Sequence, residues 1–256
     1  MSYPIVSAFG SGGLVGFMLG LLGGGGSILA TPLLLYVVGV AQPHVAIGTG
    51  ALAVSANAFV NFAGDAMKGH VWWRCAAVFC ALGVVGAVGG SSLGKAMDGD
   101  RLIFFFGIAM LVVGAPMLKP RKAVGVECRP VDLRMCLATA AVALAAGAAS
   151  GFFGIGGGFL IAPGLMLATG MPMINAIGTS LLSVGAFGLA TALNYASSGL
   201  VDWWLAAEFI VGGVFGMLLA TRLSAYKNIL NRLFAALIFV VAAYILYRNW
   251  GTAVPG

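Results

Sequence analysis

Two glycine-rich runs are the residues whose type and spacing could do chemistry in this sequence. The first glycine run is Gly23–Gly26 and the second is Gly154–Gly158, and each interrupts an apolar stretch. In a bilayer every backbone N–H and C=O needs a partner, so each run must face protein or a watery cavity. The helix expected after each run, from near Ser27 or Gly158, would point free N–H groups and a positive dipole end at that cavity. The runs therefore indicate small-anion sites, with helix packing or a hinge as the alternative.

Small polar residues extend this candidate site. Gly48-Thr49 and Gly178-Thr179-Ser180 place hydroxyl donors near expected helix starts, where they could also bond between helices. Asn57 and Asn61 are four residues apart and share a helix face, and an amide inside an apolar helix is costly unless it is paired. The predicted substrate-binding residues are Gly25, Gly26, Ser27, Thr49, Asn57, Asn61, Gly156, Gly157, Gly158, Thr179, Ser180 and Asn194.

Two acids, Glu208 and Asp65, lie inside or at the end of apolar segments. An ionisable residue in a membrane helix is a candidate for a proton relay, so both are predicted to couple transport to protons. Trp72-Trp73 and Trp203-Trp204 mark the membrane interface near these acids, which leaves a plain interfacial role open.

Several other kinds of site are disfavoured. No Gly-Lys-Ser/Thr follows either glycine run, which argues against a nucleotide loop. The four cysteines form no CxxC pair and there are two histidines, so a metal site is not expected. His44 and His70 fall at helix edges, which leaves a Ser/His nucleophile unsupported. We expect no enzymatic activity, no metal and no cofactor.

The composition places these residues in a membrane. Hydrophobic residues make up 61% and charged residues 8% of the 256 residues, against about 25% charged in ordinary soluble domains. The net charge of +6 lies mostly in short loops, which fits a positive-inside bias better than nucleic-acid binding. The sequence is therefore that of an integral membrane protein.

Apolar segments follow one another with short polar breaks. The segment at 28–40 has 13 residues and would span roughly 20 Å, too short to cross a core of about 30 Å. The expected segments are 5–22, 28–40, 45–64, 71–93 and 102–118, then 133–153, 159–169, 173–196, 203–219 and 229–247.

The order of these segments repeats. A shift of 131 positions matches six of 13 residues between 20–32 and 151–163, and a shift of 130 matches Ala46–Thr49 with Ala176–Thr179 at all four. If each glycine run makes a hairpin, ten basic residues fall on one side of the membrane and three on the other, which predicts inverted halves. The predicted divisions are a first membrane repeat (1–120), a basic cytoplasmic linker (121–132), a second repeat (133–248) and a tail (249–256).

The predicted fold is thus an all-α integral membrane protein of two inverted repeats. Each repeat has a glycine-broken helical hairpin and three further membrane helices, with about 8–10 apolar segments in all.

The paired segments LLGGGGSILATP and FFGIGGGFLIAP, each followed by AIGT, together with GLVDWW, resemble the sulfite exporter TauE/SafE family of membrane transporters. The resemblance covers residues 5–247. The first half departs from it at His70–Trp73, which lacks a counterpart of Asp202.

The resemblance implies transport of a small sulfur-containing anion, such as sulfite, thiosulfate or an organosulfonate, across the bacterial cytoplasmic membrane. We expect a secondary transporter coupled to protons or to the membrane potential. A passive anion channel and a membrane assembly factor are the alternatives. The expected partners are the anion and the lipid bilayer, without nucleic acid, and a homodimer is left open.

Overall fold

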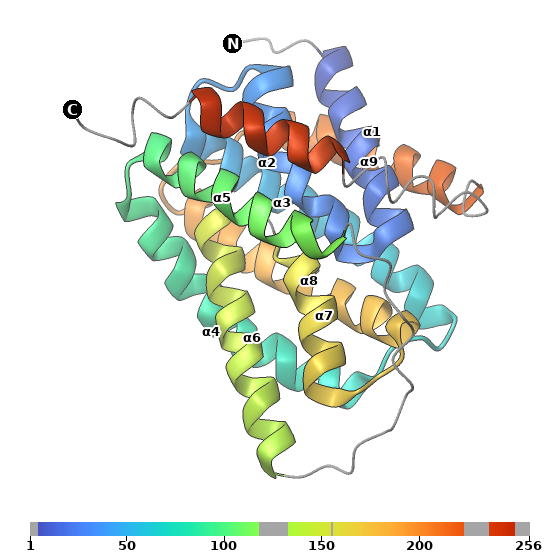
Figure 1. Ribbon diagram of the computed structural model, residues 1–256. Helices are drawn as coiled ribbons and strands as arrows, with labels where there is room; N and C mark the ends of the chain where they lie inside the picture. The colour runs from blue at the N-terminus through green and yellow to red at the C-terminus, as the bar shows by residue number, and fades with distance from the viewer. Residues whose placement is uncertain (1–4, 118–132, 155, 223–235, 249–256) are drawn as a thin grey trace.

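The computed structural model describes residues 5–117, 133–154, 156–222 and 236–248, and the described part consists of helices joined by short loops, with no strand (Figure 1). The predicted linker 121–132 and tail 249–256 lie outside it. The elements are α1 (Ile5–Leu22), η1 (Gly23–Leu29), α2 (Ala30–Leu33), η2 (Leu34–Val38), α3 (Pro43–Met67), α4 (Trp73–Ala96), α5 (Gly99–Met117), α6 (Leu133–Phe153), α7 (Gly158–Thr169), α8 (Met173–Ala196) and α9 (Trp203–Arg222). A last helix covers Ala236–Arg248.

The predicted segments correspond closely to these helices. The bounds of α1, α6 and α8 agree with the sequence prediction to the residue. Proline and glycine set several ends: α3 begins at Pro43, and Gly39 and Gly170 end the helices before them in the left-handed conformation. Among the described residues, four helices are long and apolar enough to cross a membrane: Pro43–Met67, Cys75–Ala96, Ile174–Ala196 and Trp203–Ala220.

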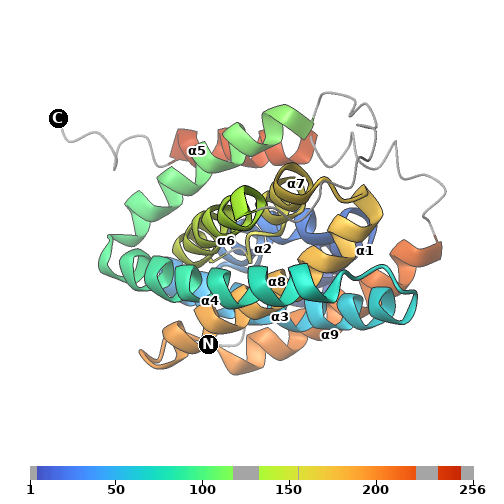
Figure 2. The ribbon, with the colours of Figure 1, turned by 90° about the horizontal axis from the view of Figure 1, so that it is seen from below.

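The two central helices, α3 and α8, cross near the middle of the molecule (Figure 2). At the crossing, the Ser55 hydroxyl donates a 2.6 Å hydrogen bond to the Gly185 carbonyl. Serine 55 and glycine 185 correspond in the repeat at a shift of 130. The two halves therefore meet at matching positions of their third segments.

On each side of this crossing, glycines allow two further helices to pack closely against each other: α1 against α9, and α4 against α6. A Cβ at Gly16 of α1 would lie 1.9 Å from the Gly213 oxygen of α9, and one at Gly90 of α4 would lie 2.0 Å from the Ala148 oxygen of α6. Absence of a side chain lets these backbones touch. The pairs α1–α9 and α4–α6 correspond in the repeat, while the inverted orientation of the halves in a membrane stays a prediction.

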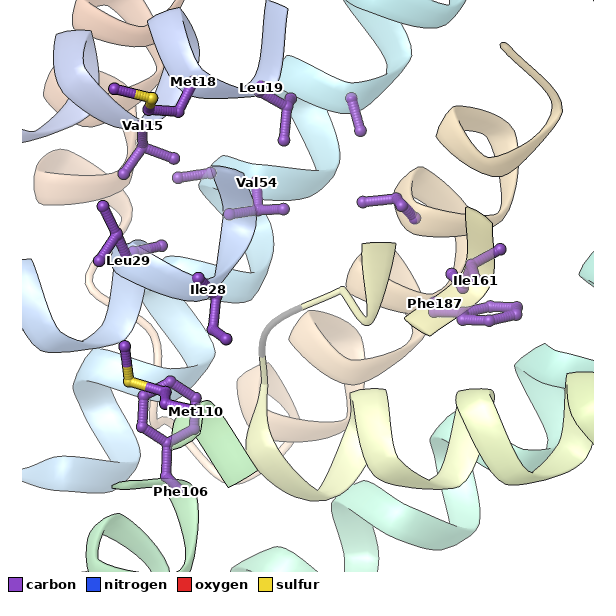
Figure 3. Close-up of a cluster of buried hydrophobic side chains, with 14 of the residues drawn as sticks. Val15, Met18, Leu19, Ile28, Leu29, Val54, Phe106, Met110, Ile161 and Phe187 are labelled. Atoms are coloured by element: carbon purple, nitrogen blue, oxygen red, sulfur yellow. The ribbon is translucent and has the colours of Figure 1, made fainter. Parts of the chain in front are cut away.

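Apolar side chains fill the space between the helices. Figure 3 shows core residues of α1, η1, α3, α5, α7 and α8 gathered around the central crossing, including Leu19, Ile28 and Val54. On one side of the molecule α5 lies along the last helix, where a Cβ at Gly107 would meet Ile245 at 3.1 Å (Figures 1 and 2).

The α4–α6 contact gives a stability prediction. Gly90→Ala should lower the free energy of unfolding by about 1–3 kcal/mol, because the added methyl would overlap the Ala148 backbone. Gly89→Ala is the matched control, since a Cβ there meets nothing within 4 Å. Thermal unfolding of the two variants in the same detergent measures the difference. Equal melting temperatures would contradict the close packing of α4 on α6.

Candidate functional site

The second glycine run leaves the start of α7 without a cap. Gly154, Gly156 and Gly157 all have positive φ, at 67°, 64° and 62°, a conformation that side chains disfavour. Among the described residues no side chain caps the N-terminus of α7, and the Ile161 N–H donates to the Gly157 oxygen at 3.1 Å. The N–H groups of the first turn therefore point out of the helix as donors.

The run lies midway along the two central helices. A Cβ at Gly156 would meet Val184 Cγ1 of α8 at 3.0 Å and Val54 Cγ1 of α3 at 3.2 Å. Both valines are fully buried and lie near the middle of their helices. The uncapped helix start is thus at the centre of the molecule, where its dipole is least screened by water.

Ser150 is the side chain closest to this helix start. A Cβ at Gly157 would lie 2.7 Å from Ser150 Cβ and 3.1 Å from its Oγ. Ser150 is 0% exposed, and its hydroxyl has no hydrogen-bond partner in the described part of the chain. A buried hydroxyl without a protein partner is costly, so the Ser150 hydroxyl is available to donate to a bound ligand. The hydroxyl and the α7 N–H groups together form a neutral donor set suited to an anion.

Sequence reasoning missed Ser150. The residue sits in the last turn of α6, among alanines and glycines that read as packing. A signal did exist, because its counterpart at a shift of 131 is Leu19. A serine that replaces leucine beside one glycine run, and not beside the other, marks a difference between the halves.

The first glycine run has another structure. Gly23–Leu29 forms a 3-10 helix that continues from α1, and neither Gly25 nor Gly26 has a positive φ. Ser27 is buried inside it, and the next α-helix starts at Ala30 and has four residues. The predicted helix start near Ser27 was therefore wrong, because tighter winding carries the chain onward without opening a gap. A seven-residue 3-10 helix is unusually long, and it packs against α7.

Thr49 and Thr179 hold loops from the opposite half. Thr49 Oγ1 accepts a 3.0 Å bond from the Asp202 N–H, and Thr179 Oγ1 accepts a 3.2 Å bond from the Trp72 N–H. The preceding glycines make room, since a Cβ at Gly48 would lie 2.4 Å from the Leu200 oxygen. These bonds explain the repeated AIGT motif, because its threonine holds the loop before α4 or α9. Each threonine hydroxyl accepts one of these bonds, so its proton can still be donated to another group.

The amides predicted for the site lie in separate places. Asn57 is 2% exposed, neither amide atom has a partner among the described residues, and a Cβ at Gly213 would lie 2.1 Å from its Nδ2. Asn61 Nδ2 donates to the Asn57 carbonyl at 3.3 Å. Asn194 is at the end of α8, where it accepts a 2.8 Å bond from Lys95.

Among the remaining predicted residues, Ser180 is buried and donates to the Ile177 carbonyl at 2.8 Å. Asp65 lies 4.0 Å from Lys68 Nζ and from His70 Nδ1, eleven residues beyond Val54 and so roughly 16 Å further along α3. Glu208 lines an open apolar groove between α1 and α9. The structure does not bring either acid to the α7 start.

Comparison with known proteins agrees with this architecture. Residues 8–245 match the family described as "Sulfite exporter TauE/SafE". Relatives from Xylella fastidiosa strains 9a5c and Temecula1 are 60% and 59% identical over 98% of this chain and 98% of their own, and both are named "Probable membrane transporter protein". YunE of Bacillus subtilis, also a "Probable membrane transporter protein", is 26% identical over 84% of this chain and 86% of its own. No solved structure matches.

The apolar spans, the family match and the names of the relatives together define a multi-pass membrane transporter and not an enzyme. The chain belongs to the sulfite exporter TauE/SafE family.

Proposed function

We propose that this transporter moves a small sulfur-containing anion, such as sulfite, thiosulfate or an organosulfonate, across the bacterial cytoplasmic membrane. The observation that carries the proposal is the uncapped start of α7 beside the unpartnered hydroxyl of Ser150, halfway along the central helices. Neutral donors at a helix start stabilise an anion without a buried cation, and they bind weakly enough to release it. The family description supports sulfur oxyanions as the class.

The binding site in this proposal is centred on Gly156, Gly157, Gly158 and Ser150. Thr179 and Ser180 of α8 are proposed to contribute to it, since Gly156 packs against the same helix at Val184. For Ser180 this requires that its hydroxyl leave the Ile177 carbonyl. The other predicted residues stay proposals for a path to and from this centre: Gly25, Gly26, Ser27, Thr49, Asn57, Asn61 and Asn194.

The proposed orientation of the protein in the membrane follows from the distribution of its basic residues. Ten basic residues of the loops near 65–74, 119–134 and 221–232 fall on one side in the hairpin topology, and three fall on the other. The positive-inside rule makes the first side cytoplasmic. Lys95 and the end of α4 are then on the periplasmic side.

Coupling to protons is proposed for Glu208 and Asp65, and the competing candidate is passive anion flow. Asp65 favours coupling because it stands close to two basic side chains at the end of a central helix. Its alternative role is to anchor the end of α3 at the interface. A homodimer is left open.

Uptake of labelled sulfite, thiosulfate and taurine into proteoliposomes, with and without an imposed pH gradient, tests the function. Coupled transport predicts flux of at least one anion that follows the gradient and loses this dependence in Asp65→Asn or Glu208→Gln. Flux that ignores the gradient would replace coupling with passive flow. Absence of flux for every sulfur anion would contradict the substrate class.

A further inference from the structure

A cation without an acidic partner lies at one end of the central helices. Lys95, in the last turn of α4, donates to the Asn194 carbonyl at 2.8 Å, to Asn194 Oδ1 at 2.8 Å and to Ser198 Oγ at 3.0 Å. All three acceptors are neutral. No carboxylate forms an ion pair with Lys95 in the part of the chain that the structure describes. Its positive charge is thus solvated by dipoles and not cancelled by an acid.

The same group of side chains joins α4 to α8. Asn194 Nδ2 donates to Ser91 Oγ at 2.6 Å and to Ser92 Oγ at 3.0 Å, and both serines belong to α4. The end of α8 also gains a cation beside its exposed carbonyls, which is favourable for a helix C-terminus. This arrangement accounts for the hydrogen bonds, but an uncharged donor would make them too. The helix end favours a positive charge here, but that charge still has no counter-ion among the described residues.

A continuous set of contacts leads from Lys95 to the second glycine run. Lys95 Nζ lies 6.0 Å from the centre of the Tyr195 ring. Tyr195 is 0% exposed and packs with Ile47, and Ile47 Cγ2 would lie 2.1 Å from a Cβ at Gly154. The Tyr195 hydroxyl is buried and has no hydrogen-bond partner among the described residues. Two buried residues, Tyr195 and Ile47, therefore separate the cation from the glycine run, and the first of them carries an unused donor.

We propose that Lys95 attracts the anion into the path at this end of the molecule, and that the Tyr195 hydroxyl is the donor between Lys95 and the start of α7. The inference rests on the proposed function, because it needs an anion path through the α7 site. An anion competes well for Lys95, since a hydrogen bond between two ions is stronger than one to a neutral acceptor. Tyr195 must turn aside as the anion passes, and its hydroxyl then replaces part of the lost hydration.

The test measures anion flux in membrane vesicles of both orientations. Lys95→Gln keeps a donor for Asn194 and removes the charge, and it should raise KM about tenfold while the maximal rate changes by less than about threefold. The rise should appear only where the anion is presented at the α4 and α8 ends. Lys95→Arg should keep KM near the native value. Arg101→Gln is the matched control, because Arg101 is an exposed cation at the start of α5 on the same end.

A second variant keeps the test decisive if Lys95→Gln does not fold. Asn194→Asp has the same shape and places a carboxylate against Lys95 Nζ, which neutralises the cation without removing it. It should also raise KM about tenfold, and added salt should shrink the difference from the native protein because salt screens the attraction. A helix clamp with no role in recognition would not respond to salt in this way.

The outcomes separate this inference from the function it rests on. Native flux with an unchanged KM in both Lys95→Gln and Asn194→Asp would overturn the role of Lys95 and leave the proposed function standing. An equal rise of KM in Arg101→Gln would also overturn it, since general surface charge would then be the cause. Absence of anion flux in the native protein would remove both.

Discussion

Gly157→Ala is expected to reduce anion transport by more than about tenfold while the protein still reaches the membrane. Gly157 occupies the N-cap position of α7 with a φ of 62°, and an added methyl would lie 2.7 Å from Ser150 Cβ and 3.1 Å from its hydroxyl oxygen. The methyl would therefore occupy the space next to the two kinds of donor that define the proposed site. Initial rates of labelled sulfite uptake in proteoliposomes measure the effect.

Backbone strain alone would also follow from this substitution, at roughly 1–2 kcal/mol for a left-handed residue. Gly199→Ala separates strain from loss of the site. Gly199 has a φ of 70°, and a Cβ there meets nothing within 4 Å. The control should lose the stability that backbone strain alone costs and keep its transport rate within about twofold. Equal losses of transport in both variants would show that strain, and not occupation of the site, explains the result.

Ser150→Ala is expected to raise KM for the transported anion about five- to tenfold, with a smaller change in the maximal rate. The reason is the loss of one hydrogen-bond donor from a buried neutral donor set. In the empty protein the change should be neutral or slightly stabilising, because the hydroxyl has no partner in the described structure. Opposite directions for affinity and stability distinguish a ligand-binding hydroxyl from a packing residue.

Thr191→Val is the matched control for this prediction. Thr191 of α8 is also 0% exposed with an unpartnered hydroxyl, and it lies seven residues beyond Val184, or roughly 10 Å along the helix. Removing its hydroxyl should leave KM unchanged. A native KM in Ser150→Ala, or the same rise of KM in Thr191→Val, would contradict the role given to Ser150.

The helices could be predicted from the sequence because polar residues, proline and glycine mark their ends. Apolar runs between polar breaks placed α1, α6 and α8 to the residue, and Pro43 and Gly170 mark turns that only a few residues tolerate. The repeat was visible for the same reason. Glycines recur at matching positions of the two halves where two backbones touch, as at Gly16 and Gly147.

The difference between the two glycine runs could not be predicted. Glycine permits both the 3-10 winding of Gly23–Leu29 and the left-handed conformation of Gly154, Gly156 and Gly157, and surrounding packing decides between them. Asn194 was predicted as a site residue from its residue type alone. In the structure it accepts a hydrogen bond from Lys95, which is 99 positions away in the sequence. The partners of Thr49 and Thr179 are likewise backbone groups of the other half, which local spacing does not encode.

The most direct test of the account is to locate the anion. Selenite has the shape and charge of sulfite, and its selenium gives anomalous scattering from crystals of the native transporter. The account predicts one ordered peak within hydrogen-bond distance of the first-turn N–H groups of α7 and the Ser150 hydroxyl, lost in Gly157→Ala crystals. A peak elsewhere in the protein, with none at the start of α7, would contradict the proposed site.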